Sequence, residues 1–433
     1  MKIKSIQLMN FRGIKNAKIE LDGKCAVLYG INGAGKTTIL RAIDLIYANI
    51  IGTLLGTRKR LAELELDDIN NDSSVAKAGI QFVLDNGEKY FYRRQIDTNS
   101  KKTHNKQELN AITSRFIKKY IDEIVENENG ASQILKKTDP MPIFVNYGVN
   151  RAVLDMPITD SIRKYGRLDA FENAIESKID FKNFLTWFRQ QEDLENEIIA
   201  RTKKEIGKDI KLPGLEAVRT AMLSMFPEFS SVRFDRTMNT LMFEKSGDNL
   251  KLNQLSDGEK CMIALFGDIA RRMVIANDNV LVNPLNVSGV VLIDEVDLHL
   301  HPSWQREIGK TLNETFPNVQ FILTTHSPQV LGGLSERYSV FAIKRENDEV
   351  LVNRADSLFG WDTNIILEEA MGTPRMEQTV LEHVEKMYQA YEDENLDEAE
   401  KEADIIDNIT NGHNDSAAPM RVMISRKRRV MNK

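Results

Sequence analysis

The sequence has few of the features that mark secreted or membrane proteins. It holds only two cysteines in 433 residues, Cys25 and Cys261, too few and too far apart to predict a disulfide framework. No apolar run approaches the roughly 20 residues that a membrane-spanning helix needs. The N-terminal stretch MKIKSIQLMNF resembles a strand rather than the apolar core of a signal peptide. These absences favour a cytoplasmic protein without membrane contact.

Neither sign of charge dominates. Lysine and arginine number 58 against 64 acidic residues, which gives a net charge of −6. This balance excludes a uniformly basic coat for nucleic acid, although local patches leave contact with DNA open. The length suffices for one large two-lobed domain and an appendage.

What the sequence does contain is a phosphate-binding loop. Gly30, Gly35, Lys36 and Thr37 have the spacing G-x-x-x-x-G-K-[ST]. A strand-like run precedes the loop and a helix-like run follows it, so backbone N–H groups and a helix dipole would point at one anion. We expect Lys36 to reach the β- and γ-phosphates and Thr37 to ligate Mg²⁺. The residues expected to hold ATP here are Asn32, Gly33, Ala34, Gly35, Lys36, Thr37 and Thr38.

Two adjacent carboxylates follow a second strand-like run. The apolar segment 290–293 is typical of a buried parallel strand, and it ends in Asp294 and Glu295. The carboxyl ends of such strands face the ligand crevice of an α/β sheet. We therefore expect Asp294 to hold Mg²⁺ and Glu295 to accept a proton from the attacking water. A solvated acidic turn is the simpler alternative, disfavoured by the phosphate loop upstream.

A histidine ends the next strand-like run. The segment 319–325 reads as another buried strand, and His326 follows it. A single histidine is usually an ordinary core or surface residue. Its place on the strand that follows the carboxylates favours a role at the γ-phosphate.

The segment LSDGE at residues 255–259 begins a predicted amphipathic helix. Ser256 and Glu259 fit a capping box, which explains both residues structurally. Gly258 is not explained in this way, because glycine weakens the first turn of a helix. The pattern therefore predicts a second phosphate-binding helix end, contributed by Ser256, Asp257, Gly258 and Glu259.

Phe11-Arg12 in LMNFRGIKNAKIEL, followed by GINGAGKT, LSDGE, VVLIDEVDLH and LTTHS, resembles the heads of the SMC/Rad50/RecF branch of ABC ATPases. The resemblance implies an α/β fold: an ABC-type P-loop ATPase head with a mixed sheet, flanking helices and an antiparallel β layer. It also implies a homodimer, or a higher homo-oligomer, that clamps ATP between two heads. Arg12 would then lie near the nucleotide, Ser256 and Gly258 would meet the γ-phosphate in trans, and Asp297 would join the dimer seam. Transporter subunits match less well, since they usually read LSGGQ.

Three further segments narrow the resemblance. VNYGVNRAVLD at 145–155, DFKNFLTWFRQQED at 180–193 and LSDGEKCMIAL are similar to compact bacterial ATPases of the PtuA type from Septu anti-phage systems, which act with a separate HNH nuclease. The chain lacks the long heptad arms and the Cys-x-x-Cys hook of Rad50-like relatives. Too few residues follow His326 for a Toprim nuclease domain as well as the closing strands of the head. The resemblance therefore implies an ATPase that acts on a separate nuclease subunit.

Two other functions stay in view. A Rad50/RecF-like repair ATPase would itself bind DNA, which predicts salt-dependent binding by this chain alone. An autonomous nuclease would need a metal cluster outside the ATP site. His299 and His301 lack further zinc-type ligands nearby, so we expect them to shape the loop after Glu295.

The domain organisation follows from these motifs. We expect a two-lobed head at 1–345, with lobe one at 1–158, a helical insertion at 159–230 and lobe two at 231–345. A C-terminal helical segment should occupy 346–433. The run 78–95 predicts a β-hairpin around Asp85-Asn86-Gly87. The run IFVNYGVNRA should connect the lobes, with Asn150 or Arg151 lining the site.

Two apolar patterns leave alternatives open. The insertion has one aromatic face, which favours a core position over partner docking because aromatic side chains chiefly bury area; its residues are Phe181, Phe184, Leu185 and Phe188. Apolar positions within 380–391 and 396–406 predict a helical hairpin with a break near Asn395, rich in acidic residues. A basic run at 426–429 follows. A simple solvated surface, docking of a nuclease and contact of the basic tail with phosphates are all left open for this C-terminal part.

Overall fold

The computed structural model describes residues 1–433 except 57–61, 85–86, 127–131, 136, 152–162, 203–210, 278–282, 348 and 432–433. The chain forms two compact units, Met1–Trp361 and Asp362–Lys433. The division therefore falls after Trp361 rather than after residue 345. The reason is that β16 (Glu349–Ala355) pairs antiparallel with β15 (Tyr338–Glu346) and so belongs to the first unit.

A six-stranded mixed sheet forms the centre of the first unit, in the order β16-β15-β3-β14-β13-β9. Four of its strands are β3 (Cys25–Tyr29), β9 (Ile143–Tyr147), β13 (Gly289–Ile293) and β14 (Val319–Thr325), with β9 at one edge of the sheet. These four run parallel and every residue in them is buried, as expected for apolar strands covered on both faces. Their carboxyl ends lie at one edge of the sheet, where the phosphate loop, the carboxylates and His326 follow.

An antiparallel sheet forms a second layer, in the order β2-β1-β4-β5-β6. Its strands are β1 (Lys2–Phe11), β2 (Ile14–Glu20), β4 (Val75–Val83), β5 (Lys89–Asp97) and β6 (Lys102–His104). The predicted hairpin is confirmed, because β4 and β5 pair antiparallel from Val75 opposite Asp97 to Val83 opposite Lys89. Residues 85 and 86 of its turn lie outside the described residues.

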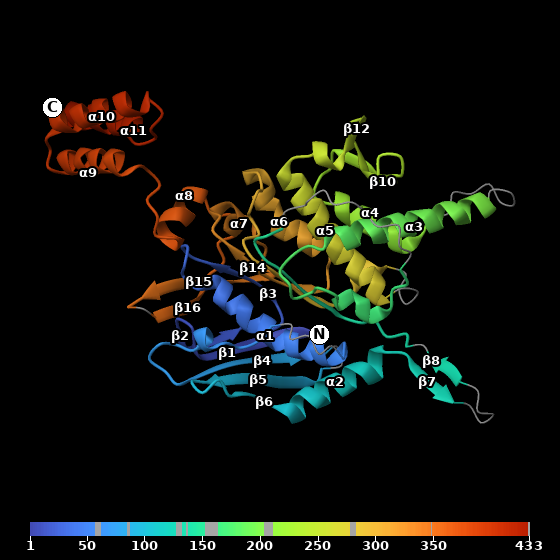
Figure 1. The fold of residues 1–433 in the computed structure, drawn as a ribbon. Coiled ribbons are helices and arrows are strands. Elements are labelled where there is room, and N and C mark those ends of the chain that lie inside the picture. The colour runs from blue at the N-terminus through green and yellow to red at the C-terminus, as the bar shows by residue number, and fades with distance from the viewer. Residues whose placement is uncertain are drawn as a thin grey trace. The chain divides into compact units, whose positions relative to one another are not determined.

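Helix α1 (Lys36–Leu54) follows the phosphate loop and packs on the antiparallel sheet (Figure 1). On its other side Tyr47 stacks on Phe144 of β9, with ring centroids 3.7 Å apart. By length and composition α1 could cross a membrane, contrary to the expectation that no apolar run approaches that length. However, 67% of that window is buried inside the structure, which is the environment of a core helix.

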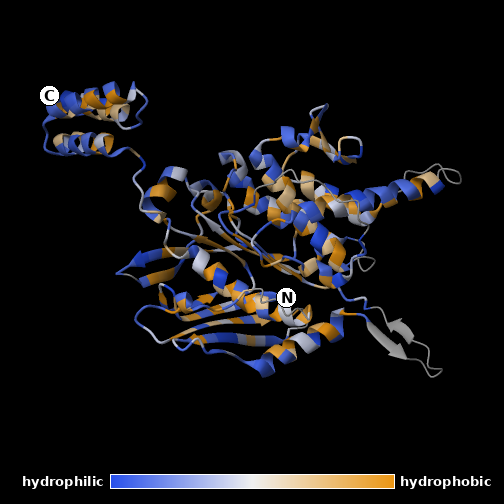
Figure 2. Cartoon of the chain, in the orientation of Figure 1, coloured by the Kyte–Doolittle hydropathy of each residue, from blue (hydrophilic) through white to orange (hydrophobic). Residues whose placement is uncertain are grey.

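Helices α5 (Asp257–Asn277), α6 (Pro302–Thr315) and α7 (Pro328–Gly333) flank the six-stranded sheet in the first unit (Figure 1). Aromatic rings pack between these layers. The ring centroid of Phe266 on α5 lies 5.8 Å from that of Phe316, and the centroid of Phe316 lies 6.3 Å from that of Phe321 on β14. Figure 2 shows the hydrophobic residues concentrated along these strands and helices. This apolar interior fixes the strand ends that carry the candidate site.

The expected helical insertion contains α3 (Phe181–Thr202) and α4 (Pro213–Leu223). Phe181, Phe184 and Phe188 are all buried, and Phe184 packs over Gly267 of α5. The core position of this aromatic face is therefore confirmed. The other elements of the unit are η1 (Leu66–Asp68), α2 (Lys106–Tyr120), β7 (Glu123–Glu126), β8 (Ser132–Leu135), η2 (Arg167–Phe171), β10 (Phe229–Asp235), β11 (Thr240–Lys245), β12 (Asp248–Lys251), η3 (Leu252–Gln254) and η4 (Pro284–Asn286).

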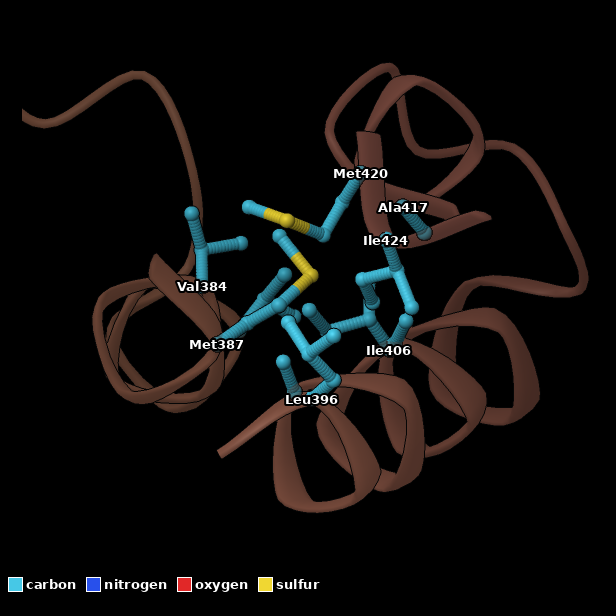
Figure 3. Packing of buried hydrophobic residues seen from close by; sticks show 10 residues of the cluster. Val384, Met387, Leu396, Ile406, Ala417, Met420 and Ile424 are labelled. Atoms are coloured by element: carbon cyan, nitrogen blue, oxygen red, sulfur yellow. The ribbon is translucent and has the colours of Figure 1, made fainter. Parts of the chain in front are cut away.

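The second unit begins with α8 (Thr363–Ile365) and η5 (Ile366–Ala370), followed by α9 (Gln378–Glu392), α10 (Leu396–Thr410) and α11 (Ala417–Met431). The last three form a bundle with its own core, in which Met387, Leu396, Ile406, Met420 and Ile424 point toward one another (Figure 3). The expected hairpin is thus part of a three-helix arrangement.

The basic run lies within helix α11 rather than in a free tail. Arg428 pairs with Asp397 and Glu400 of α10, and Lys427 pairs with Glu394. Two residues of the basic run, Lys427 and Arg428, are therefore paired with acidic side chains inside this unit. This pairing weakens the idea that the basic run is free to contact phosphates.

Candidate nucleotide-binding site

The phosphate loop has the backbone that an anion site needs. A Cβ on Gly30 would lie 2.2 Å from the carbonyl oxygen of Ile343, so the loop can pack here only as glycine. Gly33, with φ of 76°, has open space where its side chain would be, which leaves the loop accessible to a ligand. Helix α1 begins after Gly35 with no side-chain cap on its N–H groups. Such a helix end binds anions.

Lys36 lies within this loop. Its Nζ donates to the carbonyl oxygens of Gly30 (2.9 Å) and Ile31 (3.0 Å) and lies 3.4 Å from Nδ1 of His326. Burial lowers the pKa of Lys36, while the nearby carboxylates, Glu295 first among them, act in the opposite direction. The ammonium group is thus placed between the loop and the carboxylates.

Thr37 and Asp294 meet although they are far apart in sequence. The Thr37 hydroxyl donates to Oδ2 of Asp294 at 3.0 Å, and the Thr324 hydroxyl donates to Oδ1. Asp294 is 6% exposed. A hydroxyl and a carboxylate that converge in this way fit Mg²⁺, which prefers oxygen ligands and commonly takes one or two from the protein. Within the described part of the chain, no cluster of three or more metal-ligating side chains occurs.

Glu295 follows in a left-handed backbone conformation, with φ of 47°. Its N–H donates to Oγ1 of Thr324 at 2.7 Å, while its side chain is partly exposed. Oε1 of Glu295 lies 3.9 Å from Nε2 of His326. The strained backbone therefore directs the carboxylate toward the expected γ-phosphate sensor.

The surroundings of His326 favour its neutral form. Burial lowers the pKa of His326, and the positive charge of Lys36 lowers it further. Because Lys36 can only donate, Nδ1 acts as the acceptor and the proton lies on Nε2. Asp297 fixes the backbone beside it, since its Oδ1 accepts from the Thr325 hydroxyl (2.6 Å) and from the His326 N–H (3.4 Å). Asp297 thus acts within its own protomer, and its place in a dimer seam stays a prediction.

Arg12 is anchored by a buried acid. Its Nε donates to Oδ1 of Asp68 at 2.9 Å, and Arg41 of α1 donates to the same oxygen at 2.9 Å. Burial alone would raise the pKa of Asp68, but the hydrogen bonds from Arg41, the Glu65 N–H and Arg12 outweigh it and hold the pKa below its usual value. The sequence analysis missed Asp68 and Arg41. The only available signal was that Arg41 follows Thr37 by one helical turn.

Residues 25–332 match the protein family described as "AAA domain, putative AbiEii toxin, Type IV TA system". The chain belongs to this AAA family. The α/β P-loop ATPase head expected from the sequence is therefore confirmed.

Two relatives and one solved structure are similar to most of this chain. The AAA protein is 29% identical over 395 residues to "Retron Ec83 probable ATPase" of Escherichia coli, covering 76% of this chain and 69% of that one. It is 25% identical over 380 residues to "Septu protein PtuA" of Bacillus thuringiensis, covering 86% and 84%. The resemblance to PtuA-type ATPases is thus confirmed. The SMC head domain of Thermotoga maritima aligns with a TM-score of 0.47 at 15% identity, covering 82% of this chain and 100% of that one.

The LSDGE segment of this AAA protein forms the predicted capping box. The Ser256 N–H donates to Oε2 of Glu259 at 2.8 Å, and the Glu259 N–H donates back to Oγ of Ser256 at 3.3 Å. Glu259 also pairs with Lys245. Among the described residues, no hydrogen bond or ion pair joins this segment to the phosphate loop.

Gly258 has a packing role that sequence analysis missed. A Cβ at this position would lie 2.4 Å from the carbonyl oxygen of His299, in the loop that follows Glu295. This close approach accounts for Gly258, which the capping box does not explain. Contact of Gly258 with a phosphate in trans stays a prediction.

His301 caps α6, because Nδ1 accepts from the Ser303 N–H at 3.3 Å.

Arg151 is buried against the backbone of Glu295 rather than exposed at the surface of the site. Its side chain is 2% exposed, and Nη2 donates to the carbonyl oxygen of Glu295 at 2.6 Å. Asn150 is exposed. Of the two residues expected to line the site, Arg151 is the one that contacts the backbone of a predicted catalytic residue.

Proposed function

We propose that this chain is the ATPase subunit of a bacterial anti-phage defence complex. Binding of ATP would bring two heads together, and this assembly would switch a separate HNH-type nuclease. Support for the defence role comes from the retron and Septu relatives. Support for ATP hydrolysis comes from one observation, the convergence of Thr37, Asp294, Glu295 and His326 beside the phosphate loop.

Each side chain has a separate role in the proposed hydrolysis of ATP. The loop N–H groups and Lys36 bind the β- and γ-phosphates. Thr37 and Asp294 would hold Mg²⁺, which when bound offsets charge on these phosphates. Glu295 accepts a proton from the attacking water. Neutral His326 donates a hydrogen bond from its Nε2–H to the γ-phosphate as negative charge develops there.

Assembly would follow from where the nucleotide contacts lie. Ser256 and Gly258 begin a helix that has no hydrogen bond or ion pair with the phosphate loop of its own protomer among the described residues. A second copy could present this helix end to the γ-phosphate. ATP would then favour the closed pair and hydrolysis would release it, a population shift set by differential nucleotide contacts.

The test measures ATP hydrolysis and nuclease activity together. The chain is purified alone and with an HNH-type protein encoded beside its gene, and each preparation is given ATP or ADP. We expect the chain alone to hydrolyse ATP, Glu295→Gln to slow hydrolysis to a small residual rate, and the partner's cleavage of DNA or RNA to depend on the nucleotide.

The rival function is a DNA-binding repair ATPase of the Rad50/RecF kind. It predicts that the chain alone binds DNA in a salt-dependent manner. Tight DNA binding without the partner, together with nuclease activity that ignores the nucleotide, would overturn the proposal in favour of this rival.

A further inference from the structure

Two neighbouring strands bring Arg151 to Glu295. Strands β9 and β13 run parallel with Tyr147 opposite Ile293, and the N–H of Asp294 donates to the carbonyl oxygen of Tyr147 at 2.8 Å. The two chain segments therefore leave the sheet side by side. Just beyond this point, Nη2 of Arg151 reaches the carbonyl oxygen of Glu295 at 2.6 Å.

The peptide groups around Glu295 are fixed on both sides. Its N–H donates to Oγ1 of Thr324, and its carbonyl oxygen accepts from the N–H of Leu298 at 3.0 Å as well as from Arg151. These bonds hold a backbone with φ of 47°, which a glutamate seldom adopts. The side chain extends from this fixed backbone, so the direction of the carboxylate depends on the bonds that hold it.

The guanidinium of Arg151 is placed at a cost to stability. It is almost fully buried, and its Nε and Nη1 have no hydrogen-bond partner among the described residues. A buried charge with so few partners is unfavourable, and an apolar side chain of similar size would normally suit folding better.

Arg151 also contacts the helix that carries the LSDGE segment. It lies beside the thiol of Cys261 on α5; burial raises the pKa of Cys261, and the positive charge of Arg151 opposes that rise. Cys261 is one turn from the start of α5. The guanidinium thus lies between the peptide of Glu295 and the helix that would meet the second nucleotide.

We propose that Arg151 is a positioning residue that holds the Glu295 peptide in its left-handed conformation and links it to helix α5. It acts on hydrolysis through Glu295 and makes no contact with the nucleotide itself. The inference rests on the proposed function, in which Glu295 accepts the proton of the attacking water.

The test uses four variants of the full chain: Arg151→Met, Arg151→Lys, Glu295→Gln and the double variant Arg151→Met/Glu295→Gln. Methionine keeps much of the apolar length but donates no hydrogen bond, whereas lysine keeps one donor. Steady-state hydrolysis gives kcat and KM, a fluorescent ATP analogue gives affinity, and thermal melting reports folding.

We expect Arg151→Met to lower kcat by about tenfold or more while KM and affinity stay within about twofold, because only the orientation of the proton acceptor changes. Arg151→Lys should recover part of the rate. The double variant should be no slower than Glu295→Gln alone, since both changes act on the same group. Melting temperatures of the methionine variant should match or exceed that of the unmodified protein.

A structural role would give a different result. If Arg151→Met lowers melting temperature and affinity together with kcat, or if its effect multiplies that of Glu295→Gln, the positioning role is overturned. If instead Glu295→Gln hydrolyses ATP as fast as the unmodified chain, the proposed function itself is wrong. The two failures are therefore distinguishable.

Discussion

The hydroxyl of Thr37 donates to Oδ2 of Asp294 across 3.0 Å. This bond joins the first turn of α1 to the end of β13, two elements separated by most of the head sequence. It places the two expected Mg²⁺ ligands at one point, although no local pattern connects them.

The first prediction concerns this pair. Thr37→Val keeps the shape of the side chain but removes the oxygen ligand, so affinity for Mg²⁺-ATP should fall by about tenfold to a hundredfold. Titration of a fluorescent ATP analogue with and without Mg²⁺ checks this. Thr53→Val, an exposed position on the same helix, is the matched control and should leave affinity unchanged. Equal affinity in both variants would contradict the metal-binding role.

A second prediction separates packing from nucleotide contact at Gly258. Alanine there would place a Cβ 2.4 Å from the backbone oxygen of His299. Overpacking of this kind costs roughly 1–3 kcal/mol, so Gly258→Ala should lower the free energy of unfolding even without nucleotide. Chemical denaturation measures it, with Asp257→Ala, an exposed neighbour, as control. If stability without nucleotide is unaffected and only ATP-dependent assembly is lost, the packing explanation fails.

These two positions show why the motif residues could be predicted from sequence. Phosphate and Mg²⁺ demand fixed residue types at fixed local spacing, so Lys36, Thr37, Asp294 and Glu295 stand out from one sequence. The parallel strands were equally readable, because strands buried on both faces are continuously apolar.

Contacts between distant segments left no such signal. The Arg12–Asp68–Arg41 group and the Arg151–Glu295 contact each join residues whose spacing has no repeat or local pattern. Helix α11 was missed for another reason: its apolar positions Ala417, Met420 and Ile424 have helical spacing, but the basic run beside them suggested a solvated tail.

A third prediction concerns the titration of His326. Burial and the charge of Lys36 both lower the pKa of His326 below its usual value of 6.5. In the nucleotide-free protein most of the rings should therefore still be neutral at pH 6.5. NMR of labelled histidine measures this titration directly. Lys36→Met should raise the pKa only part of the way, since burial, the larger cause, remains. A pKa at or above 6.5 in the unmodified protein would show that His326 is not held neutral.

A fourth prediction uses the buried acid Asp44 on α1. Burial raises its pKa to about 8, against the opposing effects of a hydrogen bond from Asn146 and the charge of Arg41. Between roughly pH 4 and pH 8 the folded state therefore binds more protons at this site than the unfolded state. By linkage, this group's contribution to stability declines as pH rises through that window.

Asp44→Asn removes this titration. The variant should therefore be more stable, relative to the unmodified protein, near pH 8 than near pH 5, which means a larger relative free energy of unfolding at the higher pH. Urea denaturation at the two pH values provides the comparison. If the difference in stability between the variant and the unmodified protein is the same at pH 5 and at pH 8, Asp44 does not titrate in this range.

ATP-dependent pairing of the heads is measured as the mass of the protein in solution, by light scattering with Glu295→Gln to slow hydrolysis. We expect Mg²⁺-ATP to double the mass or raise it further, ADP not to do so, and the added substitution Ser256→Arg to block the change. A mass that is identical with ATP, with ADP and without nucleotide would contradict ATP-dependent pairing of the heads.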